Sequence, residues 1–262
     1  MVGAPLDRRT VEQIEMDLNR SSESMDTIFL REMHLILTNL ASDFPKVSYY
    51  QGMNYLAIFA FYVFEQDPRK AYHFFSYMIE SLIQHYFGQD FQGVHRLIYC
   101  IDKLLEKNQP KVADRLKEEG ISAIFFCVPN LITLFTSMVR NRDLYELIGD
   151  VWDVVLSCGI QGIVNALLLI LELQQNLILK LRGDDLMQVM RDVEKDPFAI
   201  AAFFSKQNPK ELQAAIKGFT KKALANSKTS GREIQALEQI HEQVRREFLD
   251  QFDGRDVNVR RR

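Results

Sequence analysis

Two short segments of the 262-residue chain carry polar side chains of types that can contact phosphate oxygens and water. The first holds Asp17 and Arg20, three residues apart, and the second holds Gln51 followed at once by Gly52. An arginine offers a permanently charged planar fork of donors that matches phosphate oxygens. A glutamine amide offers one acceptor and two donors, enough to orient a water molecule and to contact backbone nearby.

Each of these residues also has an ordinary structural interpretation. Arg20 on its own is typical of a solvated surface arginine, and Gln51 on its own is typical of a cap for the helix expected from Asn54 to Phe64. On one helix, the three-residue spacing puts Asp17 and Arg20 on the same side of a turn, where an exposed ion pair contributes only about 0.3–0.5 kcal/mol. For Arg20 and Gln51 taken singly, the chemical and the structural interpretations both stay open.

Helices must position these side chains, because apolar residues recur at three- and four-residue spacing along most of the chain. The stretches that show this most clearly are Phe29, Met33, Ile36, Leu37 and Leu40; Leu212, Ile216, Phe219 and Ala223; and Ile234, Leu237, His241, Val244 and Phe248. Breakers such as Asp67-Pro68 and Val128-Pro129 separate the periodic stretches. No run shows the sustained alternation of strands. We therefore expect an all-α fold of short-looped helices.

Composition supports a helical domain and excludes several classes of protein. The chain has only 12 glycines and 7 prolines, together about 7% of its 262 residues, against an average of about 12%. A β-sandwich needs frequent turns and would normally contain more of both. Its net charge of −3 shows no basic excess, so we expect no nucleic acid partner. Phosphate-binding loops, serine elbows and metal-ligand spacings of His or Cys are all absent, so we expect no metal site. The three cysteines are expected to be reduced thiols of a protein in a cytosolic compartment.

One uncharged stretch, from Val154 to Leu171, is long enough to cross a bilayer. Polar residues and glycines interrupt it, and Gly159 reads as a helix stop. We therefore predict two buried helices that meet between Cys158 and Gly162, and no transmembrane segment. A polar loop from Asn226 to Gly231 divides the chain into a domain over residues 1–226 and a charged C-terminal helix with a basic tail over residues 227–262.

Three motifs in the same order resemble those of the TBC domain, the Rab GTPase-activating family. The I-x-x-D-x-x-R motif is matched by Ile14, Asp17 and Arg20. The Y-x-Q-G-M-N motif is matched by Tyr49, Gln51, Gly52, Met53 and Asn54. A later Trp-Asp motif is matched by Val151, Trp152 and Asp153, followed by Leu156 and Gly159. The resemblance covers roughly residues 11 to 205 and implies an irregular multi-helix TBC-type domain.

The resemblance implies a protein that accelerates GTP hydrolysis by a small Rab-type GTPase in vesicle traffic. Arg20 would be the arginine finger, worth about 10³–10⁵ in rate, and Gln51 the glutamine finger. The family pattern makes Asp17, Tyr49, Gly52 and Asn54 supporting residues and makes Trp152 and Asp153 structural ones. GTP and Mg²⁺ would be bound by the partner, so no cofactor of its own is expected. We expect a cytoplasmic protein, peripheral to endomembranes.

The sequence also departs from the family pattern in three ways, one of which is the interval of 31 residues from Arg20 to Gln51, short for the family. Ser21, Ser22 and Glu23 stand where the family usually has Thr-Phe-Pro after the arginine. The family's opening helices, before the arginine motif, are missing, so the domain is N-terminally short and a protein partner would cover the gap. An alternative function is therefore a catalytically silent TBC-fold scaffold or structural subunit of a larger assembly.

Overall fold

The computed structural model describes residues 6–21, 27–87, 91–138, 145–192, 222, 225–226, 231–240 and 242–243. None of these residues lies in a strand, so the all-α prediction is confirmed. The helices of the first half are α1 (Arg8–Ser21), α2 (Thr27–Asp43), α3 (Met53–Val63), α4 (Pro68–Met78), the π-helical turn η1 (Ile79–Ile83) and α5 (Gln84–Tyr86). Those of the second half are α6 (Gln92–Asn108), α7 (Pro110–Glu118), α8 (Ile124–Ile132), the 3₁₀ turn η2 (Thr136–Met138), α9 (Tyr145–Leu173), α10 (Gln175–Lys180) and α11 (Gly183–Asp192).

Local sequence explains where several helices begin. The Asp7 carboxylate accepts a hydrogen bond from the backbone N–H of Thr10 at the start of α1. Asp67 accepts from the backbone N–H groups of Arg69 and Lys70, and Pro68 occupies the first position of α4, where its missing N–H costs nothing. These side chains satisfy donors that a helix leaves unpaired in its first turn.

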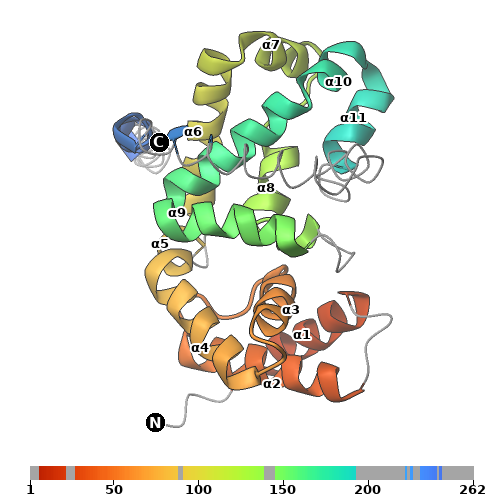
Figure 1. Cartoon of the computed structure of the whole chain (residues 1–262), viewed down its shortest axis with the longest axis vertical. Coiled ribbons are helices and arrows are strands. Elements are labelled where there is room, and N and C mark those ends of the chain that lie inside the picture. Colours follow the sequence, from red (N-terminus) through yellow and green to blue (C-terminus); the bar gives the residue numbers. More distant parts are fainter. Residues whose placement is uncertain are drawn as a thin grey trace, which may run out of the picture.

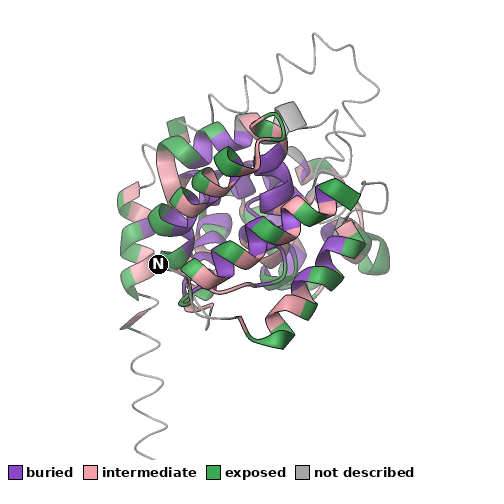
Figure 2. Ribbon diagram, turned by 90° about the horizontal axis from the view of Figure 1, so that it is seen from below, coloured by how far each residue is buried: buried purple, intermediate pink, exposed green. Residues whose placement is uncertain are grey.

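The helices form two groups along the long axis of the molecule. Figure 1 shows α1 to α4 at one end and α7, α10 and α11 at the other, with α6, α8 and α9 between them. Helix α2 contacts α1, α3 and α4, and the five apolar residues predicted to share one of its faces are all buried. Figure 2 shows these buried faces turned inward and the exposed ones outward. The core is therefore continuous through the helices that carry the motif residues.

Helix α9 holds the uncharged stretch, and it is bent as predicted. Gly159 interrupts the helix with φ 57° and ψ −131°, a conformation open to glycine. The segment Val151–Glu172 is long and apolar enough to cross a membrane, yet 72% of its most apolar window is buried inside the fold. Packing within the domain therefore accounts for its apolar composition.

The prediction that Val128-Pro129 separates two helices is wrong. Pro129 lies inside α8, which continues to Ile132. Beyond α8 the backbone turns sharply, because Leu134 (φ 45°) and Phe135 (φ 69°) are both left-handed, at a cost of about 1–3 kcal/mol each. The surrounding structure holds them there: the backbone N–H of Phe135 donates to the Asn130 carbonyl at 3.0 Å.

The described part of the C-terminal helix, residues 231–240, packs on α6. Ile234 is fully buried, and its carbonyl lies 3.8 Å from Cys100 Sγ. Lys107 and Glu233 form an ion pair at 2.6 Å. The predicted periodic stretch over residues 212–223 and the domain boundary after Asn226 lie at or outside the edges of the described residues.

Candidate functional site

Asp17 is the centre of a polar cluster inside the group of helices α1 to α4. It lies on the buried side of α1, between Ile14 and Leu18, and is only 3% exposed. Its Oδ2 accepts hydrogen bonds from Tyr49 Oη at 2.9 Å and from Gln13 Nε2 at 3.0 Å. A buried carboxylate is stable only when it is paired in this way.

Arg20 lies in the last turn of α1 with its side chain 65% exposed. Its Nη1 is 3.6 Å from Asp17 Oδ1, as the three-residue spacing indicates. An ion pair this exposed at one end contributes about 0–1 kcal/mol to the stability of the fold. Its main effect is to orient the Arg20 side chain. The guanidinium is anchored on one side and faces solvent on the other.

Ser21 joins the end of α1 to α3. Its hydroxyl donates to the Asp17 carbonyl at 2.9 Å and accepts from Asn54 Nδ2 at 3.0 Å. Asn54 Nδ2 also lies 3.3 Å from the Asp17 carbonyl, and its residue is 2% exposed. The sequence interpretation missed Ser21 as a site residue. The available signal was that a serine keeps the hydroxyl of the threonine that usually follows the family's arginine.

These contacts hold the segment that carries Gln51 to the end of α1. Tyr49 and Asn54 lie on either side of Gln51 in the sequence. Tyr49 donates to the Asp17 carboxylate, and Asn54 donates to the Asp17 carbonyl and to the Ser21 hydroxyl. Gln51 itself is exposed in a turn and makes no hydrogen bond with any residue that the structure describes. The residue that caps α3 is Gly52, without a side-chain bond, so the interpretation of Gln51 as a helix cap is not supported.

Gly52 is required by its backbone and by its neighbours. Its φ of +112° is rarely open to other residues. A Cβ built on it would lie 3.1 Å from Thr133 Cγ2 and 3.6 Å from Ile132 Cγ1. The turn that carries Gln51 therefore lies directly against the end of α8.

Burial raises the pKa of the Tyr49 hydroxyl well above its ordinary value, and the Asp17 carboxylate raises it further. The neutral hydroxyl therefore persists through the physiological range and keeps donating to Asp17. Burial also raises the pKa of Tyr50, whose Oη has no hydrogen-bond partner among the described residues.

Trp152 is a core residue, as expected from its apolar surroundings, and is 4% exposed. Its ring packs against Phe59 at 5.0 Å and Phe74 at 5.7 Å between centroids, and its Nε1–H donates to the Leu134 carbonyl at 3.0 Å. Asp153 is exposed on α9, and its side chain makes no hydrogen bond or ion pair with a described residue, so its structural role stays a prediction.

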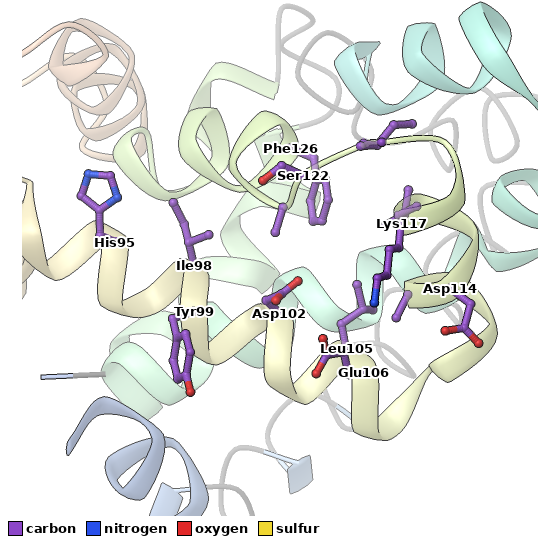
Figure 3. A pocket seen from close by; sticks show the side chains of 15 residues that line it. His95, Ile98, Tyr99, Asp102, Leu105, Glu106, Asp114, Lys117, Ser122 and Phe126 are labelled. Atoms are coloured by element: carbon purple, nitrogen blue, oxygen red, sulfur yellow. The ribbon is translucent and has the colours of Figure 1, made fainter. Parts of the chain in front are cut away.

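A groove of about 830 Å³ lies elsewhere, between α6, α7 and the start of α8, and none of the candidate site residues lines it. Figure 3 shows Asp102 of α6 and Lys117 of α7 on facing walls. Burial, and then Glu106, raises the pKa of Asp102. Within the described ranges no three His, Cys, Asp or Glu residues are grouped closely enough to hold a metal ion.

The residues of the first two motifs thus meet at the α1–α3 junction, and Trp152 of the third packs on Phe59 of α3. Residues 5–179 match the family model of the Rab-GTPase-TBC domain. The chain belongs to the TBC family. The matched residues include Arg20, Gln51 and Trp152, and end within α10.

Curated relatives of this TBC chain include proteins named as GTPase activators. It is 24% identical over 148 residues to "GTPase-activating protein GYP5" of Saccharomyces cerevisiae, covering 56% of this chain and 16% of that protein. It is 29% identical over 112 residues to "Cell division control protein 16" of Schizosaccharomyces pombe, covering 43% of this chain and 36% of that protein. The chain thus spans only a small part of the length of the relatives it matches.

Two solved TBC structures share the fold. The Ypt/Rab-GAP domain of Gyp1p matches with a TM-score of 0.68 and 16% identity, over 86% of this chain and 76% of that one. The Chlamydomonas flagellar RabGAP TBC domain matches with a TM-score of 0.63 and 13% identity, over 84% of this chain and 67% of that one. The all-α TBC fold is therefore confirmed.

Proposed function

We propose that this protein accelerates GTP hydrolysis by a small Rab-type GTPase, with Arg20 and Gln51 completing the partner's active site in trans. The observation that carries the proposal is that two exposed side chains, one cationic and one amide, leave the same junction of α1 and α3. Buried neighbours hold both at their bases, whereas their ends are open to a partner. Membership of the TBC family supports it.

GTP hydrolysis needs an attacking water held in line and positive charge against the oxygens where negative charge develops. The Arg20 guanidinium supplies that charge to the phosphate oxygens. The Gln51 amide accepts from and orients the water. GTP and Mg²⁺ arrive with the partner, and the protein acts in the cytoplasm at the surface of an endomembrane that carries the GTPase.

The proposal predicts that Arg20→Ala and Arg20→Lys each abolish most of the stimulation. The loss should reach about 10³-fold or more, because lysine cannot reproduce the planar fork. Single-turnover hydrolysis across a panel of GTP-loaded Rab proteins measures the effect. Arg8→Ala is the matched control, since Arg8 is an exposed arginine of the same helix whose one ion-pair partner among the described residues is Glu12.

Binding separates this function from the alternative. If Arg20 acts at the transition state, the variant still binds the GTPase, and the rate falls far more than the affinity. If the Arg20→Ala variant stimulates hydrolysis as strongly as the Arg8→Ala variant, the assignment of Arg20 and Gln51 as the two fingers is wrong. Gln51→Ala should also lower the maximal rate without loss of binding.

A second candidate is a catalytically silent scaffold of a larger assembly. Apolar side chains exposed on the first two helices favour it, namely Met16 (46%), Ile28 (74%) and Leu35 (43%). A chain that stimulates no GTPase in the panel and purifies only with a stable protein partner would establish this function in place of the first.

A further inference from the structure

The turn that carries Gln51 does not rest on α3 alone. The side chains of Ile132 and Thr133, at the end of α8, lie on the side of Gly52 where a Cβ would stand. Nothing in the proposed chemistry of Arg20 and Gln51 uses these residues. A Cβ built at Gly52 would nevertheless lie only 3.1 Å from Thr133 Cγ2, the nearest atom to it outside residues 51–53.

The Thr133 side chain is fixed in one orientation by hydrogen bonds. Its Oγ1 donates to the Pro129 carbonyl at 2.7 Å and pairs with Ser137 Oγ at 2.9 Å. Its own carbonyl accepts from Thr136 Oγ1 at 2.6 Å. Since the hydroxyl is bonded on one side of Cβ, the methyl group is held against Gly52 on the other.

Trp152 in turn holds the segment that follows Thr133. The next two residues, Leu134 and Phe135, are in the left-handed conformation, which needs support from the surrounding structure. The Trp152 indole N–H supplies a hydrogen bond to the Leu134 carbonyl, and its ring is fixed against Phe59 of α3. Helix α9 is thereby connected to the Gln51 turn through a chain of direct contacts.

We propose that Thr133 and Trp152 are positioning residues for Gln51, an inference that rests on the proposed function. The Thr133 methyl supports the backbone at Gly52, and the hydrogen bond from the Trp152 N–H to the Leu134 carbonyl keeps Thr133 in position. Loss of either contact lets the turn shift. A shift of less than about 1 Å is enough to move the Gln51 amide away from the position in which it orients the attacking water. Such small misplacements of an orienting group lower the rate strongly.

Three substitutions separate the contacts. Thr133→Ser removes the methyl and keeps the hydroxyl, Thr133→Val keeps a methyl against Gly52 and removes the hydroxyl, and Trp152→Phe keeps an aromatic ring and removes the N–H. We expect Thr133→Ser and Trp152→Phe to lower the maximal stimulated rate about 10-fold, with the half-saturating GTPase concentration changed by less than about twofold. Thr133→Val should stay near wild type, because β-branched valine is itself restricted at χ1 and keeps a methyl against Gly52 without the hydroxyl. Thr38→Ser is the matched control, because Thr38 makes the same hydroxyl bond within α2.

Amide hydrogen exchange gives a second readout that needs no GTPase. The Met53 N–H bonds to the Tyr50 carbonyl and the Tyr55 N–H to the Gly52 carbonyl, each at 3.2 Å, so both report on the turn. Thr133→Ser should speed exchange at these amides and Thr133→Val should not, at equal thermal stability. Unchanged exchange and an unchanged maximal rate in Thr133→Ser would overturn the inference. If wild type stimulates no GTPase, the proposed function fails, and the exchange of these amides alone decides whether Thr133 seats the turn.

Discussion

Two adjacent tyrosines show how differently the same side chain can act at the candidate site. The Tyr49 hydroxyl donates to the buried Asp17 carboxylate, whereas the Tyr50 hydroxyl is buried without a hydrogen-bond partner among the described residues. A hydrogen bond to a charged group contributes about 1.5–3 kcal/mol, and an unpaired buried hydroxyl costs about 1–3 kcal/mol. The two residues should therefore respond to the same substitution with opposite signs.

We predict that Tyr49→Phe lowers the free energy of unfolding by about 1.5–3 kcal/mol, while Tyr50→Phe leaves it unchanged or raises it by about 1 kcal/mol. Urea unfolding measures both, and each variant is the control for the other. Equal losses in the two variants would contradict the role of the Tyr49–Asp17 bond. Tyr49→Phe should also reduce GTPase stimulation, because Asp17 would hold Arg20 less firmly.

The same tyrosines predict a dependence of stability on alkaline pH. Their pKa values are raised in the folded protein, so above pH 10 the unfolded chain loses these protons while the folded one keeps them. Stability therefore falls as the pH rises through and beyond 10. The fall should be shallower in Tyr50→Phe than in wild type, as measured by urea unfolding between pH 9 and 11.

At the scale of the helices, α9 depends on a bend at one residue. Gly159 has φ 57° and ψ −131°, whereas Gly149 of the same helix has helical geometry. Among the described residues outside the glycine's own helical turn, a Cβ added at either position meets no atom within 4 Å. Any difference between the two substitutions must therefore come from the backbone conformation and not from a clash.

We predict that Gly159→Ala destabilises the fold by about 1–3 kcal/mol, since it forces alanine into a conformation that only glycine adopts readily. Gly149→Ala should stabilise it by about 0.5–1 kcal/mol, because alanine favours the helix. Thermal unfolding of both variants tests the pair. A similar change in melting temperature for both would mean that α9 is not bent at Gly159 in solution.

At the scale of the whole molecule, the C-terminal helix docks on the domain. Ile234 is fully buried against α6 and covers Cys100, and burial, with a further contribution from Glu238, raises the pKa of that thiol to about 12. A thiol with so high a pKa reacts slowly, because the thiolate is the nucleophile. The charged helix that the sequence sets apart from the domain is thus packed on it.

We predict that Ile234→Asp undocks this helix and makes Cys100 react with a thiol reagent at least about 10-fold faster, because both burial and the raised pKa are lost. Ile240→Asp is the control, since Ile240 of the same helix is 46% exposed. Mass spectrometry after timed labelling identifies the cysteine that reacts. No acceleration at Cys100 in Ile234→Asp would show that the helix does not cover it.

The sequence by itself determined the helical class, the buried face of α2, the bend at Gly159 and the motif residues of the TBC family. These follow from local rules, because side-chain periodicity and glycine conformation act over a few residues. Only the tertiary structure decided that Tyr49 bonds to Asp17, 32 residues away, that Ser21 bonds to Asn54, and that Thr133 lies against Gly52. It also kept Pro129 inside α8, against the local signal. Such contacts depend on how whole helices pack, which no local spacing encodes.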